Sequence, residues 1–404
     1  MRKGYREMAC KFCGKNNMKE IIDIGHQPLA NAFLTKEQLS LPEIHYPLRV
    51  DVCEDCKLVQ LREMVDPKTI FKNDYIYYSS QSPANVKHAE ELVGSLQLQK
   101  GMTVVEIASN DGYLLQHIPE GVERLGIEPC KDVAEVAIEM GIPTVIDFFT
   151  ETLAKDLNIE ADVIIGINVF AHVPDINNFV SGLEKLLKPD GMIIIEFPHF
   201  YNLIKQSQFD TIYHEHAFYF SLEACLNIFK AHGLKVFAVK EIPEHGGSLR
   251  LFIGRGNKTV SSSVYTMYAM EALSGMELSA FISQVFTIRQ RTLEKLFEIK
   301  HKKREFYTDI VGYGAAAKAN TFLNFCGINT DLIPFIIDRS TYKQDMFLPG
   351  SHIPVEGEES LKITRPKYVM IFPWNLQEEI VNQLSYIRNW KGKFITAIPE
   401  IDIW

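Results

Sequence analysis

The sequence contains no long uninterrupted run of apolar residues. Its longest apolar stretches, such as VIIGINVFAHV, fall far short of the roughly 20 residues that span a bilayer as a helix. The first residues, MRKGYREMACKFCG, also lack the apolar segment that a secretory signal peptide requires. These two absences predict a cytoplasmic protein with no membrane partner and with reduced thiols.

Positive charge is also scarce. The 404 residues include 42 lysines and arginines against 51 aspartates and glutamates, which gives a net charge of −9. Nucleic-acid binding depends on clustered basic residues, and the run KHKKR at 300–304 is typical of a solvated helix end. The composition, 46% hydrophobic and 23% charged, indicates a soluble globular protein of two or three domains that binds no nucleic acid.

Cysteine is not abundant, but four of the seven cysteines form two C-x-x-C pairs. Two such pairs supply the tetrahedral thiolate set that zinc prefers, and four thiolates leave no open coordination position. We therefore expect a structural zinc ion that takes no part in chemistry, and a redox or disulfide function is the alternative. Acidic neighbours do not favour a DNA-binding zinc ribbon. The expected metal ligands are Cys10, Cys13, Cys53 and Cys56.

The loop G-x-G-x-x-G is missing where a nucleotide-binding sheet would begin. Residues 101–118, GMTVVEIASNDGYLLQHI, predict a strand, a turn and a helix, as in the first unit of such a sheet. The turn offers only Gly112 and carries Glu106 and Asp111, whereas a pyrophosphate prefers bare backbone amides. Acids here suit a cationic ligand without phosphate, and S-adenosylmethionine (SAM), with its sulfonium and ammonium, fits that description.

Further polar residues follow the next predicted strands. Ligands of open α/β sheets collect outside the carboxyl ends of the strands, where an acid such as Glu128 commonly binds ribose hydroxyls. Together these residues predict a SAM-dependent methyltransferase, and the alternative is a generic Rossmann-like domain whose acids cap helices. The other strand-end residues are Asp147 and Phe148, which suit an adenine, then Asn168, His172, Pro198 and His199.

A second nucleotide-binding pattern lies near the C-terminus. YTDIVGYGAAAKANTFLNF predicts a strand, then Gly312-x-Gly314-x-x-Ala317, then a helix, and Asp338 ends the following strand. This pattern fits the dinucleotide fingerprint better than the first sheet does, so an NAD-dependent oxidoreductase is a competing prediction. Long helices are expected between the two sheets, over residues 262–304.

Proton-handling side chains crowd together in DTIYHEHAFYFS, residues 210–221. Such a cluster is a site of acid–base chemistry, a satisfied polar core or a metal site. His214 and His216 diverge if they lie on one regular helix, so a single one of them is expected to face the pocket.

A glycine pair, Gly246-Gly247, stands before a predicted strand in EHGGSLRLFIG. It predicts a hairpin turn or, alternatively, a backbone that a substrate approaches closely. In the second case His245 and Ser248 would lie on the rim of the substrate site.

These motifs resemble the three-domain nucleotide-sugar C-methyltransferases, which methylate carbon 3 of a 4-keto sugar. The resemblance runs nearly end to end and rests on the paired C-x-x-C, EIASNDGYLL, NVFAHVPD, YHEHAFYFS, HGGSLR and GYGAAAKANTFLNF. It implies an α/β protein in three parts. These are a zinc-binding domain (1–70), a class I SAM methyltransferase Rossmann-like domain (71–255), and a helical bridge with a C-terminal Rossmann-like domain (256–404) that no longer serves a nicotinamide cofactor.

The resemblance also implies roles for site residues. His216 would act as the general base that removes the C3 proton, which the neighbouring ketone acidifies, because the pKa of histidine lies near working pH. Tyr213, Glu215 and His172 would support this base. A tyrosine of DYIYYSSQS would line the pocket, with Tyr77 favoured over Tyr75 and Tyr78. The loop residues Ala108 and Asn110 would contact the cofactor, and His199, His245, Ser248 and Lys318 the nucleotide-sugar.

The expected substrate is a 4-keto-6-deoxy sugar linked to thymidine (dTDP) or guanosine diphosphate (GDP). Three alternatives stay open beside it. They are an oxygen- or nitrogen-methyltransferase acting on a sugar, the NAD-dependent sugar oxidoreductase and a non-catalytic zinc-dependent binding protein.

Overall fold

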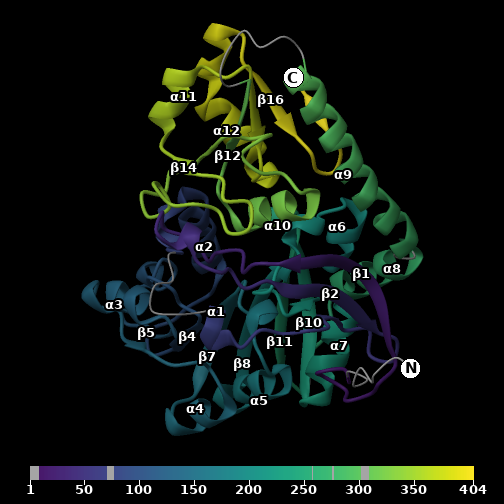
Figure 1. Ribbon diagram of the computed structural model, residues 1–404. Helices are drawn as coiled ribbons and strands as arrows, with labels where there is room; N and C mark the ends of the chain where they lie inside the picture. Colours follow the sequence, from purple (N-terminus) through teal and green to yellow (C-terminus); the bar gives the residue numbers. More distant parts are fainter. Residues whose placement is uncertain (1–8, 71–76, 257, 275–276, 302–308) are drawn as a thin grey trace.

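The computed structural model describes residues 9–70, 77–256, 258–274, 277–301 and 309–404. Tyr75 and most of the basic run at 300–304 lie outside these residues. The described chain forms three β-sheets that stack along the molecule, with the N-terminal sheet between the other two (Figure 1). Within the described residues, no helix has both the length and the apolar character needed to cross a membrane.

The N-terminal sheet is antiparallel and borrows its fourth strand from the middle of the chain. Its order is β1-β2-β3-β9, and β9 pairs with β3 through Val59 opposite Tyr219. The segment that contains the two histidines is therefore fastened to the cysteine-bearing domain. The elements are β1 (Met18–Gln27), β2 (Tyr46–Cys53), β3 (Val59–Leu61), α1 (Pro67–Ile70) and β9 (Phe218–Tyr219).

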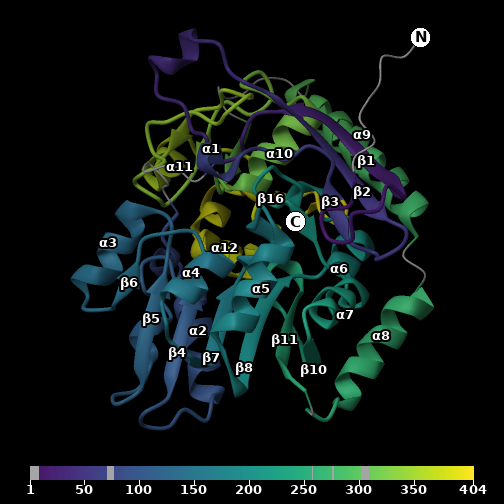
Figure 2. The same cartoon turned by 90° about the horizontal axis from the view of Figure 1, so that it is seen from below.

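The second sheet has seven strands in the order β10-β11-β8-β7-β4-β5-β6, and β11 runs antiparallel to both its neighbours. Its central strands are continuously apolar because helices cover both faces. Figure 2 shows α8 beside β10 at one edge and α3 beside β6 at the other. The elements are α2 (Pro83–Ser95), β4 (Thr103–Ile107), β5 (Glu123–Ile127), α3 (Lys131–Glu139), β6 (Thr144–Val145), α4 (Glu151–Asp156), β7 (Ala161–Ile167), α5 (Ile176–Leu186), β8 (Leu187–Pro198), α6 (Phe200–Lys205), α7 (Leu222–Ala231), β10 (Leu234–Ile242) and β11 (Ser248–Arg255).

The helix expected directly after β4 does not form. The chain makes only a short 3-10 turn over Leu115–His117. Pro119 follows at once, and the residue before a proline is pushed out of helical geometry. The helix that packs here is α2, which precedes β4 in sequence and begins at the Ser82 cap, whose hydroxyl accepts from the backbone N–H of Asn85.

The third sheet has the order β14-β13-β12-β15-β16-β17 and is parallel except for β17. The predicted helical bridge is present as α8 and α9, and α9 runs along one side of the molecule to this sheet (Figure 1). The elements are α8 (Ser262–Ser274), α9 (Leu278–His301), β12 (Ile310–Tyr313), α10 (Ala317–Cys326), β13 (Ile336–Ile337), β14 (Val355–Glu356), α11 (Glu358–Thr364), β15 (Tyr368–Ile371), α12 (Gln377–Gln383), β16 (Lys393–Thr396) and β17 (Asp402–Ile403).

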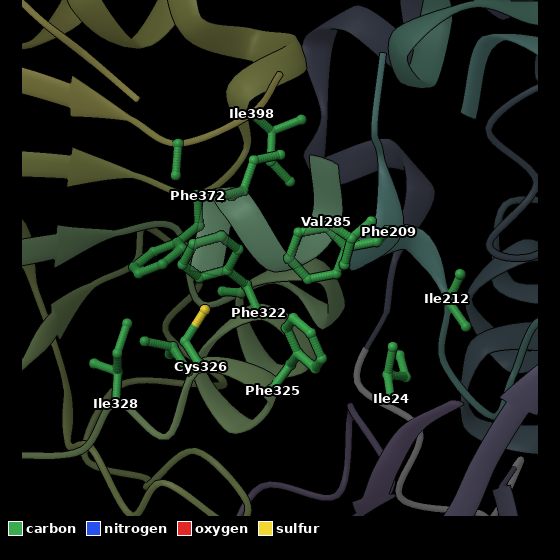
Figure 3. Packing of buried hydrophobic residues seen from close by; sticks show 14 of the residues in the cluster. Ile24, Phe209, Ile212, Val285, Phe322, Phe325, Cys326, Ile328, Phe372 and Ile398 are labelled. Atoms are coloured by element: carbon green, nitrogen blue, oxygen red, sulfur yellow. The ribbon is translucent and has the colours of Figure 1, made fainter. Parts of the chain in front are cut away.

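One hydrophobic core joins all three parts of the chain (Figure 3). It holds Ile24 of β1, Val285 of α9 and Phe322 of α10 around Phe209, whose side chain is fully buried. The Phe209 ring lies 5.0 Å from the ring of Phe325 in an edge-on contact. Removing a buried phenylalanine side chain costs about 3–5 kcal/mol. The residues just before the histidine cluster are thus anchored in a core that the C-terminal domain supplies.

Candidate active site

A cavity of about 980 Å³ lies where the three parts of the chain meet. Its lining includes residues at the carboxyl ends of β4, β5 and β7, together with Asn31 of the N-terminal part and Lys318 of α10. Ligand sites of parallel sheets lie at these strand ends. The volume is at the upper end of the range for one drug-sized ligand, so the cavity has room for two ligands side by side.

Five residues predicted to bind the cofactor line one side of this cavity. Three of them adopt positive φ angles, with 57° at Ala108, 50° at Asn110 and 54° at Asn168. Non-glycine residues are strained in this region, and such strain gathers at functional sites. The five lining residues are Ala108, Asn110, Glu128, Phe148 and Asn168.

Glu128 follows β5 and is only 4% exposed. One of its carboxylate oxygens accepts from the backbone N–H of Cys130 at 2.8 Å, and the other from the backbone N–H of Asn110 at 3.0 Å. Burial raises the pKa of Glu128, and these two bonds oppose that shift. Each oxygen keeps a second lone pair, so the fixed carboxylate can accept from two neighbouring hydroxyls of a ribose.

The other four predicted cofactor residues lie outside the cavity lining. Burial raises the pKa of Glu106 well above its usual value and holds this carboxyl neutral. Asp111 accepts from the backbone N–H and the hydroxyl of Ser80. Gly112 has no room for a side chain, since a Cβ would lie 2.5 Å from an isoleucine methyl. Asp147 is exposed and accepts from the next backbone N–H. These four shape or border the loop without lining the cavity.

Three aromatic side chains of the predicted acid–base cluster also lie next to one another in the cavity. The ring centroids of Tyr213 and His216 are 4.0 Å apart, and those of His172 and His216 are 4.9 Å apart. All three residues line the cavity. The structure thus brings the segment after β7 and the 210–221 segment together, although 44 positions separate the two histidines.

The backbone fixes the tautomer of His216. Its Nδ1 lies 2.8 Å from the carbonyl oxygen of Thr211. A carbonyl only accepts, so Nδ1 carries the proton in the neutral ring and Nε2 keeps its lone pair. Burial lowers the pKa of His216 well below its usual value, and the neighbouring His172 disfavours a second positive charge here. His216 is therefore a neutral ring with a free basic nitrogen at the cavity.

Glu215 does not orient the His216 ring. Its Oε1 accepts from the side-chain amide of Asn31 at 2.6 Å, and burial raises its pKa to about 7. Burial also lowers the pKa of His172 to about 4, and hydrogen bonds to the backbone carbonyls of Glu215 and Asn168 oppose this shift. Neither Asn31 nor the carbonyl of Thr211 was identifiable from the sequence, because an amide in an N-terminal loop and a main-chain oxygen carry no motif.

His214 points away from this cluster. Its Nε2 lies 3.2 Å from the carbonyl oxygen of Pro47, and its ring makes an edge contact with Tyr46 at 5.8 Å. Of the three tyrosines considered, Tyr77 and Tyr78 line the cavity, while Tyr75 is outside the described residues. The Tyr77 hydroxyl accepts from Asn85 at 3.2 Å.

Three of the four residues predicted to contact substrate line the cavity, and the fourth does not. His245 lies 3.0 Å from the amide nitrogen of Asn168, and Ser248 donates to a backbone carbonyl at 2.9 Å. Lys318 reaches in from α10. His199 is buried outside the lining, with its Nε2 2.6 Å from Glu271. A substrate role for His199 has no support from its position.

The glycine pair forms the loop of the β10–β11 hairpin and packs against protein, not against the cavity. A Cβ on Gly246 would lie 2.4 Å from the Trp374 ring, and one on Gly247 would lie 2.4 Å from the Asn202 amide. Both glycines also have positive φ angles. The two glycines therefore make room for neighbouring side chains of the protein, and not for a substrate.

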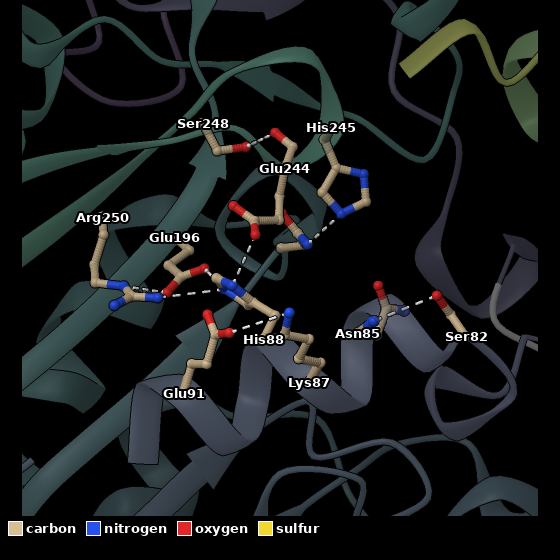
Figure 4. A network of polar contacts seen from close by, with 11 residues as sticks. Ser82, Asn85, Lys87, His88, Glu91, Glu196, Glu244, His245, Ser248 and Arg250 are labelled. Atoms are coloured by element: carbon tan, nitrogen blue, oxygen red, sulfur yellow. Dashed lines mark hydrogen bonds and ion pairs between the residues drawn. The ribbon is translucent and has the colours of Figure 1, made fainter. Parts of the chain in front are cut away.

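A buried polar network beside the cavity was not predicted (Figure 4). The two ring nitrogens of His88 lie 2.7 Å from Glu196 and 3.1 Å from Glu244, and Arg250 pairs with Glu196. Carboxylates only accept, so these two contacts favour protons on both ring nitrogens, while the donor Nη2 of Arg250 also lies 3.3 Å from Nε2. Burial opposes this charge, but the bond to Glu196 still raises the pKa of His88. A glutamate inside the apolar run MIIIEF was the signal for this network.

The four paired cysteines gather at one point of the N-terminal sheet. Their sulfur atoms all lie within 4.8 Å of one another, with 3.5 Å between Cys10 and Cys56 and 3.6 Å between Cys13 and Cys53. Tetrahedral zinc with Zn–S bonds of about 2.3 Å needs sulfurs about 3.8 Å apart. The donor set and its spacing fit a structural zinc ion.

Comparisons with known proteins define the class first. Residues 85–239 match the family described as "Methyltransferase domain", and residues 10–71 match "Putative zinc binding domain". The magnesium protoporphyrin IX methyltransferase of Synechocystis PCC 6803 with bound SAM is 15% identical, with a TM-score of 0.36, over 48% of this chain and 100% of that chain. A SAM-dependent methyltransferase of Aquifex aeolicus is 18% identical, with a TM-score of 0.35, over 47% and 98%. The two family matches define the protein as a methyltransferase with a zinc-binding domain.

The family follows from the whole chain. Residues 243–399 match "C-methyltransferase C-terminal domain". C-methyltransferase NovU of Streptomyces niveus is 33% identical over 402 residues, which cover 97% of this chain and 95% of NovU. The chain therefore belongs to the C-methyltransferase family.

Loss of the zinc ion should disturb the active site as well as the N-terminal domain, because β9 pairs with β3. We expect Cys53→Ser to reduce the bound zinc and to lower Tm by roughly 10 °C, and we expect methyl transfer to fall in parallel with metal content. Elemental analysis and calorimetry measure the first two effects. Cys225→Ser is the matched control, since Cys225 is buried outside the cluster. A metal-free enzyme with unchanged Tm and full activity would refute the coupling.

The histidines around the cavity should titrate far apart. We expect His216 to gain its proton at a lower pH than a free histidine, because its pKa is lowered, and His88 at a higher pH, because its pKa is raised. Nitrogen NMR of histidine-labelled protein reports both states, and spectra of His216→Gln and His88→Gln assign the signals. A His216 ring that titrates near pH 6.5 would contradict its burial in a neutral form.

Proposed function

We propose that the protein transfers a methyl group from SAM to carbon 3 of a nucleotide-linked 4-keto-6-deoxy sugar, with His216 as the general base. The observation that carries the proposal is the free Nε2 of a neutral His216 in the cavity that the strand-end residues also line. The end-to-end membership in the C-methyltransferase family supports carbon as the acceptor atom.

Methylation at carbon requires a base and an acidified C–H bond. The ketone at C4 lets the electron pair of the broken C3–H bond spread onto oxygen, so an imidazole can remove the proton. His216 takes this proton at Nε2 while its Nδ1–H stays bonded to the Thr211 carbonyl. Tyr213 and His172 flank the ring and are candidates to donate a hydrogen bond to the enolate oxygen. The proton leaves to solvent after the methyl transfer.

The cofactor side has donors and acceptors that suit SAM. SAM supplies an electrophilic methyl group on a sulfonium. Glu128 would accept from the ribose hydroxyls, and Phe148 would contact the adenine, since both line the cavity next to Ala108 and Asn110. The strained backbone at these positions fixes the loop before the ligand arrives. Two ligands held in one enclosed cavity gain most of their acceleration from positioning.

The third domain does not favour nicotinamide chemistry. In its loop the backbone N–H of Ala315 donates to Asp338 at 2.7 Å, and Gly314 packs so tightly on Pro373 that a Cβ would lie 2.3 Å from that ring. The loop amide and the acid that a dinucleotide would use are bonded to each other. Arg339, Ser340 and Lys343 line the cavity beside it and offer cationic and hydroxyl groups to a nucleoside diphosphate.

The base assignment predicts a selective loss. We expect His216→Gln to slow both methyl transfer and cofactor-free deuterium exchange at C3 by at least ~1000-fold. The reason is that the proposed mechanism gives the C3 proton no other base. SAM affinity should stay within about threefold. The measurements are mass spectrometry of a panel of dTDP- and GDP-linked 4-keto-6-deoxy sugars, and calorimetry for SAM.

His214→Gln is the matched control for this experiment. It removes a histidine two positions away that faces Pro47, so it should lower Tm and leave the exchange rate near that of the wild type. Equal losses in the two variants would count against His216 as the base. Methyl transfer without exchange by the wild type would favour an oxygen- or nitrogen-methyltransferase.

The ribose assignment predicts which acid matters for the cofactor. We expect Glu128→Gln to weaken SAM binding by roughly 10- to 100-fold, because one charged acceptor is lost. Asp147→Asn should change the dissociation constant by less than about twofold, because Asp147 is exposed and outside the lining. Isothermal titration with SAM and with S-adenosylhomocysteine measures both. A larger loss of SAM affinity in Asp147→Asn than in Glu128→Gln would overturn the assignment.

A further inference from the structure

Lys318 stands in an unfavourable place for a lysine. It is the second residue of α10, where the helix dipole disfavours a cation. Burial lowers the pKa of its ammonium, with Asp210 opposing the shift. Among the described residues, no carboxylate oxygen lies within 4.0 Å of it, and its ammonium instead contacts the Asn375 side-chain oxygen at 2.6 Å and the Trp374 ring at 4.5 Å. The direct contacts of this ammonium are therefore with neutral groups, and Asp210 acts on it from a longer distance.

A short chain of contacts fixes this ammonium relative to the general base. The same Trp374 donates from Nε1 to Asp210 at 2.8 Å. Asp210 directly precedes Thr211, whose carbonyl holds the His216 ring at 2.8 Å. Lys318 and His216 both line the cavity, and the charge of Lys318 lowers the pKa of His216, as a nearby cation does. The lysine and the proposed base therefore share one cavity and influence each other electrostatically.

We propose that Lys318 is a further catalytic residue, whose ammonium stabilises the enolate oxygen formed at C4 of the substrate. This rests on the proposed function. When the C3–H bond breaks, its proton goes to Nε2 of His216 and its electron pair spreads onto the C4 oxygen. Lys318 keeps all its protons in this step and donates a hydrogen bond to that oxygen. The pair then returns to form the C3–CH3 bond as the S–CH3 bond breaks and sulfur becomes a neutral thioether.

A full charge does more here than a neutral donor. The enolate carries a negative charge in a cavity of low polarity, where an ammonium attracts it more strongly than a phenol does. The substrate is neutral at that oxygen before the step, so the attraction grows as the proton leaves. An interaction that strengthens toward the transition state raises kcat without tightening substrate binding.

The test compares Lys318→Met with Lys318→Arg, which keeps the charge. Cofactor-free deuterium exchange at C3 of the active 4-keto nucleotide-sugar gives kcat and KM, and inhibition by the free nucleoside diphosphate reports on phosphate binding. We expect Lys318→Met to lower kcat for exchange by roughly 100- to 1000-fold, with KM and the inhibition constant within about threefold. Lys318→Arg should exchange at least ~10-fold faster than Lys318→Met.

Each other outcome decides against the proposal. An unchanged kcat, or equal losses in the two variants, would show that the charge is not used in the step. A loss confined to KM and to nucleoside diphosphate binding would make Lys318 a phosphate ligand. Tm of Lys318→Met should equal or exceed that of the wild type, because the substitution removes a half-buried cation that directly contacts only neutral groups. If Lys318→Met fails to fold, the premise that a lysine is unfavourable at this position is wrong. If the wild type exchanges no keto sugar, the proposed function itself fails.

Discussion

The structure depends on how the segment from Phe209 to Tyr219 is held. A neutral imidazole is useful as a base only if its free nitrogen is fixed, and a main-chain carbonyl five residues earlier fixes it. That carbonyl stays in place because three contacts with other parts of the chain hold the segment. Phe209 is buried in the shared core, Thr321 of α10 donates to the carbonyl of Ile212 at 3.1 Å, and β9 pairs with β3. His216, the proposed base, belongs to the methyltransferase part, yet its position requires all three parts.

The histidines around the cavity show how environment assigns charge to one residue type. His172, His216 and His245 have lowered pKa values, chiefly because burial disfavours their charged forms. His88 is half-buried, but carboxylates face both its ring nitrogens and raise its pKa. The cavity therefore presents three neutral rings near the strand ends and one imidazolium tied into an ion-pair network with Arg250. Acid–base capacity at neutral pH rests with the rings that lack carboxylate partners.

Sequence patterns predicted the two Rossmann-like sheets, the cysteine cluster and a part of the cavity lining, because strand ends and motif spacing are local properties. They did not separate residues that line the cavity from residues that support it. Glu106 and His199 occupy strand ends as Glu128 does, but their side chains turn into the protein. Which way a side chain turns depends on packing partners far away in sequence, such as Glu271 for His199. The β3–β9 pairing was unpredictable for the same reason, since a two-residue strand has no periodicity.

The third domain shows that a nucleotide-binding loop can be kept and given another use. Its strand, turn and helix survive, but the bond from Ala315 to Asp338 and the tight packing of Gly314 on Pro373 occupy the groups that a dinucleotide would need. The helix start that would face a pyrophosphate carries Lys318, and the Trp374 ring lies under that ammonium and also bonds Asp210. A helix N-terminus without a cation attracts anions by itself. A lysine there without a carboxylate partner can attract an anion more strongly, and in the proposed reaction the enolate oxygen would be such an anion.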